Sequence, residues 1–334
     1  MFTNKTVLIT GGTGSLGREL TKTILKNHPE IKKLIVFSRD EQKQFKMAQD
    51  FPKKEYHQIR YLIGDVRDYN RLKRAFKEVD YVIHAAAMKH VHIAEYNPDE
   101  CVKTNIGGAE NVINAAIATN VERVVSLSTD KACAPINLYG ATKLTSDKLF
   151  IAANNITGFN KITFSVVRYG NIMGSNGSVM PFFMSKVKEG VLPITNPEMT
   201  RFNISLKEGV EMVLYALKNA WGGELFVPKI PSYKIVDVAS AIGPNCKHEI
   251  IGIRPGEKIH EEMITSSDSF TTYDINNYYV ILPIEPNWEL NEFISEYNAK
   301  KVPEGFHYNS KSNERYLSVE ELKYLINTYV KNEC

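Results

Sequence analysis

Tyr139 and Lys143 are the residues whose types and spacing first indicate chemistry. They are four positions apart, so both side chains share one face if the segment is helical. A cationic amine near a phenol favours the phenolate, which can remove a proton from a hydroxyl group while a hydride leaves the same carbon. Because this spacing is common by chance, the alternative is a surface tyrosine beside a solvated lysine. Its place after a fifth predicted strand makes the pair more specific.

A glycine-rich turn gives the second chemical signal. Thr10-Gly11-Gly12-Thr13-Gly14-Ser15-Leu16-Gly17 directly follows a predicted strand and opens a predicted helix. Glycine lets the backbone approach a pyrophosphate, whose negative charge is favoured by the free N–H groups at a helix N-terminus. The sequence therefore predicts dinucleotide binding by Gly11, Thr13, Gly14, Ser15, Leu16 and Gly17. An ordinary strand-to-helix turn is the alternative.

Polar residues after the second and third strands bear on the choice of dinucleotide. Ser38-Arg39-Asp40 ends the second strand, and Lys43 follows one turn later. Ser38, Arg39 and Lys43 can hold a 2′-phosphate, which favours NADP over NAD. The alternative is a solvated loop in which Asp40 caps the helix. Asp65-Val66 is placed to contact an adenine edge, or to form a simple turn.

The elements that must position these residues alternate regularly. Short apolar runs without polar alternation predict strands buried on both faces at Thr6–Thr10, Leu34–Ser38, Ile59–Ile63, Tyr81–Ala85, Val124–Ser128 and Ile162–Val167. Helical patterns lie between them at Leu16–Lys26, Asp40–Phe51, Asn70–Lys77, Asn105–Thr119 and Gly140–Asn154. This order predicts the α/β class, with a Rossmann-like, doubly wound parallel sheet.

After about residue 170, segments punctuated by Gly and Pro replace the regular alternation. We expect an NADP-binding Rossmann domain over residues 1–170 and a smaller α/β substrate lobe over residues 171–334, with an approximate boundary that the chain can cross back. Helices are expected in this lobe at Ser205–Asn219, where Ser205 and Glu208 have capping-box spacing, and at Val319–Tyr329.

Composition excludes several classes of function. The 334 residues include 41 Lys+Arg and 38 Asp+Glu, and a net charge of +3 gives no reason to expect nucleic-acid or membrane-surface binding. No apolar run approaches the roughly 18 residues of a membrane span, and no signal peptide is recognised, so we expect a cytoplasmic protein. No metal site is expected. Because the cysteines are far apart, we expect free thiols at Cys101, Cys133, Cys246 and Cys334.

Together, the glycine turn, Thr129, Tyr139 and Lys143 resemble the extended short-chain dehydrogenase/reductase family. Further motifs resemble one group within it, the soluble UDP-N-acetylglucosamine 4,6-dehydratases of the C5-inverting kind, which act early in making pseudaminic acid for flagellin and surface glycans. These motifs are His84-Ala85-Ala86-Ala87-Met88-Lys89-His90, Ala94-Glu95-Tyr96-Asn97-Pro98, Ser128-Thr129-Asp130-Lys131, Asn137 to Lys143, Arg168-Tyr169-Gly170-Asn171, Met199-Thr200-Arg201-Phe202 and Arg254-Pro255-Gly256-Glu257-Lys258. The likeness spans about residues 1 to 280.

The resemblance implies a role for each catalytic residue. Tyr139, with Thr129 and Lys143, would act as base at the sugar 4-hydroxyl, Asp130 as acid at C6 and Lys131 as base at C5. Lys131 must be neutral to act as a base, and we expect a water-poor pocket beside NADP⁺ and Lys143 to favour that form. The alternative for Asp130 and Lys131 is an ion pair in a loop.

The resemblance also implies binding residues and an assembly. Tightly bound, recycled NADP would contact the residues named above together with Ala85, Ala86, Lys89, Thr104, Tyr139 and Lys143. The nucleotide sugar would contact Lys89, Asn171, Val179, Met180, Pro181, Phe182, Phe183, Thr195, Arg201, Arg254 and Glu257. The arginine fork suits diphosphate oxygens, and Glu257 would accept hydrogen bonds from ribose hydroxyls. Members of this family usually form oligomers, so the resemblance implies a homo-oligomer between dimer and hexamer.

Several alternatives remain open at this stage. A nucleotide-sugar 4-epimerase needs Tyr139 and Lys143 but has no use for an acid and base at positions 130 and 131. His92, Asn176 and Asn203 depart from the expected pattern. Asn176 and Asn203 lie in the substrate lobe and leave the sugar and the nucleotide, UDP or GDP, unassigned. Spacing does not show how C5 is reprotonated, so inversion or retention also stays open. A non-catalytic NADP-sensing protein is the alternative of another class, and the complete Tyr139 and Lys143 pair argues against it.

Overall fold

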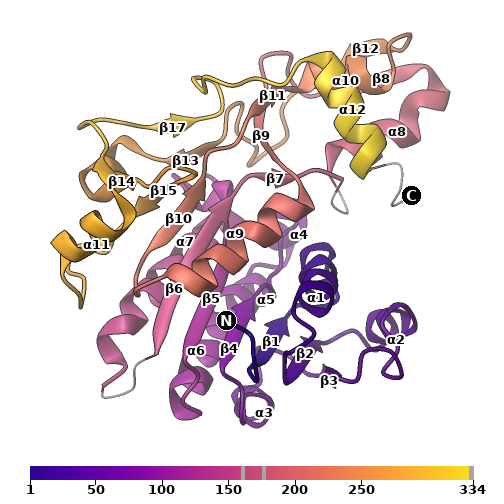
Figure 1. The fold of residues 1–334 in the computed structure, drawn as a ribbon. Helices are drawn as coiled ribbons and strands as arrows, with labels where there is room; N and C mark the ends of the chain where they lie inside the picture. The colour runs from indigo at the N-terminus through magenta and orange to yellow at the C-terminus, as the bar shows by residue number, and fades with distance from the viewer. Residues whose placement is uncertain (159–161, 175–177, 331–334) are drawn as a thin grey trace.

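The computed structural model describes residues 1–158, 162–174 and 178–330 (Figure 1). Its centre is a ten-stranded sheet in the order β16-β14-β15-β10-β6-β5-β4-β1-β2-β3. Seven neighbouring strands of this sheet are parallel. They are β1 (Thr6–Thr10), β2 (Lys33–Ser38), β3 (Ile59–Ile63), β4 (Tyr81–His84), β5 (Arg123–Thr129), β6 (Thr163–Tyr169) and β10 (Leu225–Pro228).

All six strands expected from the apolar runs are present, and β1 and β3 have the expected bounds. The strands run parallel around the crossover between β1 and β4, which confirms the Rossmann-like α/β class. Their residues lack polar alternation because helices cover both faces of the sheet, so few positions on either face meet water.

One face of the sheet is covered by α1 (Ser15–Asn27), α2 (Glu41–Asp50) and α9 (Leu206–Asn219), which bury residues such as Leu20, Met47 and Val213 in one apolar cluster. The other face is covered by α3 (Tyr69–Ala75), α6 (Gly108–Ala118) and α7 (Leu138–Ala153). Full burial of one large apolar side chain contributes roughly 1.5–3 kcal/mol, so the two clusters hold the helices firmly on the sheet.

The expected helix Asn105–Thr119 is reached through a continuous run of α5 (Pro98–Val102), a π-helical turn (Lys103–Gly107) and α6. The turn widens the helix where the Asn105 side chain accepts from the N–H of Met88 (2.8 Å) and donates to its carbonyl (3.0 Å). π-Turns of this kind often occur at functional sites. Here the turn fixes the loop after β4.

The chain returns to the main sheet after residue 171. The α9 helix packs beside α1, β10 pairs with β6, and the edge is extended by the antiparallel strands β15 (Tyr278–Ile281), β14 (Thr272–Asp274) and β16 (Lys300–Lys301). The predicted capping box of α9 is present, since Ser205 and Glu208 hydrogen-bond reciprocally. Near this edge lies α11 (Leu290–Tyr297) (Figure 1).

A second group of elements stands beyond the carboxyl ends of the parallel strands (Figure 1). It contains helices α4 (Val91–Tyr96), α8 (Val179–Lys186), α10 (Ile235–Ile242) and α12 (Val319–Tyr329), and strands β7 (Asn171–Ile172), β8 (Val191–Ile194), β9 (Thr200–Ile204), β11 (Ser232–Lys234), β12 (Lys247–Ile250), β13 (Glu262–Ile264) and β17 (Tyr308–Asn309). The α8, α10 and α12 helices share a third apolar cluster. Within the described ranges, no helix has the length and apolar character needed to cross a membrane.

Candidate active site

A cavity of about 1290 Å³ lies at the carboxyl ends of the parallel strands. The glycine turn and the ends of β2 and β4 line one part of it, while α7, β7, β9 and the segment 254–261 line another. Most residues expected to bind cofactor or substrate gather here, namely Gly11, Thr13, Gly14, Ser15, Leu16, Gly17, Ser38, Arg39, Asp40, Lys43, Val66, Ala85, Ala86, Lys89, Thr104, Thr129, Lys131, Tyr139, Lys143, Asn171, Val179, Pro181, Phe182, Phe183, Thr195, Arg201, Arg254 and Glu257.

Three expected residues do not line this cavity. Asp65 is turned toward Arg67, which donates from Nη2 at 2.7 Å. Met180 lies on the face of α8 that packs into the third apolar cluster, where it is 2% exposed, so its expected place in the nucleotide pocket is wrong. Asp130 is 1% exposed and stands behind Lys131. Asn176 and Cys334 lie outside the described residues.

The glycine turn has the geometry of a dinucleotide cradle. Gly11 has a φ of +65°, and a Cβ there would lie 2.8 Å from the main-chain nitrogen of Ala86. A Cβ on Gly17 would lie 2.6 Å from the Cα of Gly12. Gly14 caps α1 without a side-chain hydrogen bond, so the first N–H groups of the helix stay available to an anion. These positions fit a pyrophosphate and exclude larger side chains.

Two cations stand at the end of β2. The Arg39 side chain is 55% exposed, with Nη1 3.7 Å from the Asp65 carboxylate, and Lys43 Nζ lies 3.6 Å from Asp40. Asp40 also caps α2 by accepting from the N–H of Lys43 at 2.9 Å. Ser38 is buried, and its hydroxyl accepts from Gln44 at 3.0 Å. Asp40 is therefore the helix cap, while Arg39 and Lys43 face the cavity as exposed cations.

Tyr139 and Lys143 lie in the first turns of α7, which is capped by Asn137 through a 2.8 Å hydrogen bond from the N–H of Gly140. Both side chains are buried. Burial raises the pKa of Tyr139 to about 12, against the opposing effects of the Lys131 charge and a Thr129 hydrogen bond. Burial lowers the pKa of Lys143. In the chain by itself burial has the larger effect on the pKa of Tyr139, and Lys131 is the cation that lowers it. The expected effect of Lys143 on the phenolate stays a prediction.

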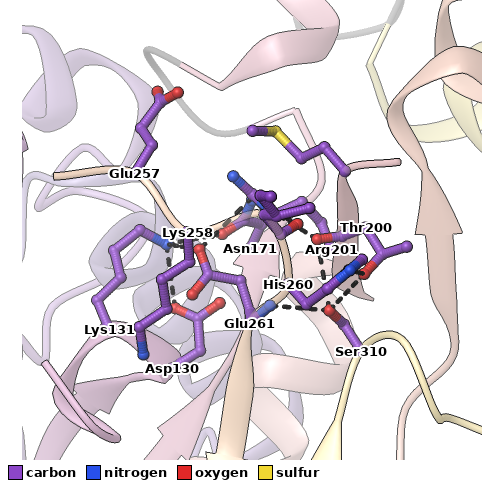
Figure 2. Close-up of polar contacts among 12 residues, drawn as sticks. Asp130, Lys131, Asn171, Thr200, Arg201, Glu257, Lys258, His260, Glu261 and Ser310 are labelled. Carbon is purple, nitrogen blue, oxygen red and sulfur yellow. Dashed lines mark hydrogen bonds and ion pairs between the residues drawn. The ribbon is translucent and has the colours of Figure 1, made fainter. Parts of the chain in front are cut away.

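Lys131 is the centre of a charged cluster that joins three segments (Figure 2). Its Nζ lies 3.1 Å from Oδ1 of Asp130 and 3.3 Å from Oε1 of Glu261. It also donates to Oδ1 of Asn171 at 3.3 Å. Thr129 donates to the same Asp130 oxygen at 2.9 Å. The cluster therefore places an amine between two buried carboxylates at the cavity wall.

The charges in this cluster shift one another's protonation. Burial lowers the pKa of Lys131, but the Asp130 and Glu261 carboxylates outweigh it and raise the pKa above its ordinary value. In the chain by itself Lys131 is therefore held protonated by these two carboxylates, and its expected neutral form beside NADP⁺ and Lys143 stays a prediction. Burial and the nearby Glu261 raise the pKa of Asp130 despite the attraction of Lys131. Lys131 and Arg201 hold the pKa of Glu261 low against burial.

A buried ion pair lies below this cluster. Nη2 of Arg168 is 3.2 Å from Oδ2 of Asp147, which also accepts from Ser128 Oγ at 2.6 Å. Arg168 donates in addition to the carbonyl of Met263 at 3.0 Å. The pair ties the ends of β5 and β6 to α7 and β13. The strand that carries Thr129, and the strand that leads to Asn171 on β7, therefore keep a fixed relation to α7.

The two arginines expected to bind the diphosphate differ in their surroundings. Arg201 is 7% exposed, and its Nη1 donates to the carbonyls of Thr200 (2.8 Å) and Ile259 (3.1 Å). Arg254 is exposed, and its Nη1 lies 3.8 Å from Glu257. The structure therefore provides one fixed and one adjustable guanidinium.

Sequence reasoning missed Glu261, Lys258 and Asp147. Glu261 stands three residues after the Arg254 to Lys258 motif in a segment without helical or strand periodicity, so it carried no pattern of its own. Lys258 was seen in the motif, yet its contact with the carbonyl of Cys133 (2.6 Å) crosses the fold. Asp147 follows Lys143 by four residues on the same helix, and this spacing was a usable signal.

Two further expectations concern thiols and metals. Cys101, Cys133 and Cys246 are free thiols. Among the described residues, no group of three His, Cys, Asp or Glu side chains is arranged to hold a metal ion. Of the two described positions that depart from the expected motifs, His92 is exposed at the start of α4, while Asn203 is buried on β9 in register with Asn171.

The fold is that of known nucleotide-binding α/β enzymes. The structure of DesIV, a dTDP-glucose 4,6-dehydratase from Streptomyces venezuelae with NAD and TYD bound, matches with a TM-score of 0.66 and 21% identity over 76% of this chain and 86% of that chain. At this identity the match shows the fold alone. Pen from Bacillus thuringiensis matches with a TM-score of 0.88 and 40% identity over 98% of each chain.

The chain belongs to the polysaccharide biosynthesis protein family, whose model matches residues 7–283. A Campylobacter jejuni protein named UDP-N-acetylglucosamine 4,6-dehydratase (inverting) is 54% identical over 333 residues, which is 98% of each chain. A Rickettsia bellii protein named UDP-glucose 4-epimerase is 43% identical over 98% of this chain and 96% of its own length. The resemblance expected from the motifs is thereby confirmed.

Proposed function

We propose that this protein is a lyase that removes water from UDP-N-acetylglucosamine across C4 to C6 and inverts C5. The product would be UDP-2-acetamido-2,6-dideoxy-β-L-arabino-hex-4-ulose, an early intermediate for a surface-glycan or flagellin sugar of the pseudaminic acid type. The observation that carries the proposal is the contact of the buried Asp130 with Lys131, which lines the cavity together with Tyr139. The names of relatives at 54% and 53% identity support it.

Each group has a distinct proton to move. The glycine turn, with Arg39 and Lys43, would hold NADP, which would supply reversible hydride transfer at the sugar. Tyr139 would remove the proton of the 4-hydroxyl, with Thr129 as its hydrogen-bond partner. The resulting 4-ketone makes the C5 proton acidic, so Lys131 can remove it while Asp130 protonates the departing 6-hydroxyl. No net oxidation occurs, because the hydride returns to the same sugar.

The contact between Lys131 and Asp130 bears on how these two groups reach their working states. Lys131 is held protonated by its two carboxylates, whereas burial favours a protonated Asp130. Transfer of one proton along the 3.1 Å hydrogen bond from Nζ to Oδ1 breaks an N–H bond and forms an O–H bond. It leaves a neutral amine beside a carboxylic acid, which are the base and the acid that dehydration requires.

Ligand contacts follow from the lining of the cavity. Arg201 and Arg254 would bind the diphosphate, while Glu257 would bind the ribose and Asn171 the sugar. The exposed cations Arg39 and Lys43 favour NADP over NAD at the end of β2. We also propose that the protein works in the cytoplasm as a homo-oligomer between dimer and hexamer, which light scattering would test.

The second candidate is a nucleotide-sugar 4-epimerase, since the Rickettsia bellii relative carries an epimerase name. An epimerase needs Tyr139 but has no use for an acid and a base at C6 and C5. The buried Asp130, with its raised pKa and its contact with Lys131, therefore favours dehydration. A non-catalytic NADP-binding protein would have no need of this charged cluster.

The test is incubation of the purified protein with UDP-N-acetylglucosamine in deuterated water, followed by NMR of the products, and a repeat with GDP-N-acetylglucosamine. A 6-deoxy-4-keto sugar with deuterium at C5 is the expected result, and its coupling constants report inversion or retention. A C4 epimer alone would establish the epimerase. No change in either sugar would reject both enzymes.

A further inference from the structure

Glu261 is a buried carboxylate that the proposed proton transfers do not use. It precedes β13, lines the cavity and is 2% exposed. Its Oε1 lies 3.3 Å from Nζ of Lys131 and 3.6 Å from Nε of Arg201 (Figure 2). A buried carboxylate is unfavourable unless cations or donors compensate it. Here a single oxygen is shared by the amine of the reaction centre and an arginine.

The main chain of Glu261 is fixed by residues distant in sequence. Its N–H donates to Oγ of Ser310 at 2.9 Å, and the N–H of Ser310 donates to the Glu261 carbonyl at 2.8 Å. Oγ of Ser310 is in turn 2.7 Å from Oγ1 of Thr200, next to Arg201 on β9. These contacts hold the backbone independently of the ion pairs. The Glu261 side chain therefore extends toward Lys131 and Arg201 from a backbone that is held in place (Figure 2).

We infer that Glu261 is a positioning residue, which holds the Lys131 amine beside Asp130 and links it to the arginine proposed to bind diphosphate. The inference rests on the proposed function for the identity of the reaction. The contacts themselves concern only this chain. Nothing in the proposed chemistry requires Glu261 to touch the sugar, so its effect passes through Lys131.

Sharing one oxygen makes the two cations interdependent. A diphosphate that attracts Arg201 weakens the hold of that arginine on Oε1, and Lys131 then becomes the main ion partner of Glu261. Substrate binding at the nucleotide end thus changes the balance of charges at the sugar end. Coulomb attraction over such distances is strong in a buried site, so the coupling should be measurable.

Other charged and titratable groups also face Lys131 and are part of the expected pH response. They come from η2 (Asp130–Ala132), α7, β9, β11 and the segment before β13, and comprise Asp130, Tyr139, Arg201, Tyr233 and Glu261, while Lys258 acts on Glu261. Among them, Asp130 and Glu261 favour the protonated amine, whereas Arg201 opposes it. Removal of the Glu261 charge should therefore lower the pKa of Lys131, not raise it.

The first experiment measures the neutral fraction of Lys131 without any substrate. Trace acetylation with acetic anhydride across a pH series, followed by mass spectrometry, compares Lys131 with exposed Lys188 as an internal reference. Neutral amine is the reactive form, so wild-type Lys131 should label more slowly than Lys188. Glu261→Gln should move the Lys131 midpoint to lower pH and raise its labelling about tenfold, as a shift of one pKa unit requires. An unchanged midpoint would overturn the inference.

The second experiment separates position from charge. Glu261→Asp keeps the carboxylate but shortens its reach, so labelling of Lys131 should stay slow while kcat for the dehydration falls and KM changes less. Glu262→Gln is the matched control, because Glu262 does not line the cavity and is not among the charges that act on Lys131, so it should alter neither readout. If the Glu261→Gln variant does not fold, the pH midpoint of Lys131 labelling in the wild type and the kcat of Glu261→Asp still test the positioning role. Equal kcat in Glu261→Asp and wild type would contradict a positioning role.

The two proposals fail in different ways. A wild-type protein that leaves UDP-N-acetylglucosamine unchanged contradicts the proposed function, whereas the labelling comparison still reports the hold of Glu261 on Lys131. A working dehydratase with unshifted Lys131 labelling in Glu261→Gln contradicts only the role of Glu261.

Discussion

The glycine turn and the charged cluster around Lys131 line the same cavity but are built in different ways. The turn is a run of consecutive residues between β1 and α1, and it presents main-chain N–H groups. The cluster joins Asp130 and Lys131 to Asn171, Arg201 and Glu261, which come from separate segments. A site made of backbone is local, whereas a site made of opposed charges needs the whole fold to bring its members together.

The two regions also differ in what a substitution removes. In the turn the constraint is space, since a Cβ at Gly17 meets main-chain atoms of Gly12. In the cluster the constraint is charge balance, because removing one partner leaves another ion buried and unpaired. We therefore expect damage to the turn to appear as lost dinucleotide affinity, and damage to the cluster to appear as lost turnover or stability.

The largest effect is expected from Lys131→Met, which removes the proposed C5 base. Product formation should fall about 100- to 10 000-fold, the usual contribution of a general base, while the dinucleotide stays bound. NMR of the product and absorbance of the bound cofactor measure the two quantities. Lys148→Met, on the exposed face of α7, is the control. Unimpaired turnover in Lys131→Met would remove this lysine from the mechanism.

Asp147→Asn tests whether the cluster depends on the ion pair below it. The change leaves Arg168 buried without its carboxylate partner, which costs about 3–5 kcal/mol of unfolding free energy. Denaturant unfolding measures this loss. Glu189→Gln, which breaks the exposed pair with Lys186, should cost less than about 1 kcal/mol. Equal costs for the two variants would mean that the buried pair does not hold the strand ends.

Gly17→Ala tests the spatial constraint of the turn. Its Cβ would press on Gly12, and overpacking of this kind costs about 1–3 kcal/mol, so dinucleotide affinity should fall roughly tenfold to a hundredfold. Isothermal titration calorimetry with NADP measures the affinity. Gly107→Ala is the matched control, because nothing lies within 4 Å of a Cβ at that position. An unchanged NADP affinity in Gly17→Ala would show that the turn accommodates the added Cβ.

Arg39→Ala should have the smallest effect and the most selective one. Loss of the guanidinium should weaken NADP by about tenfold and NAD by less, since only NADP carries the 2′-phosphate. Competitive binding of the two dinucleotides measures the ratio. Arg74→Ala on α3, which is exposed and outside the cavity, should leave the ratio unchanged. Equal weakening of both cofactors would reject the 2′-phosphate contact.

Much of the fold could be predicted because its signals are local. The six predicted strands and the capping box at Ser205 each depend on neighbouring residues. The π-turn at Lys103–Gly107 had no such signal, since Asn105 is held there by the distant loop at Met88. The return of β10 and its antiparallel neighbours to the main sheet was also not readable from periodicity.

The sequence alone determined the glycine turn, the chain order of strands and helices, and the residue types available at the reaction centre. These features follow from backbone geometry and from spacing within a helix or a strand. Tertiary structure decided the protonation of that centre. Lys131 was expected to be neutral in a water-poor pocket beside NADP⁺ and Lys143, yet in the chain by itself Glu261, 130 residues further along, faces it at 3.3 Å. Burial can be inferred from a pattern, but the sign of the nearest charge depends on which distant segments the fold brings into contact.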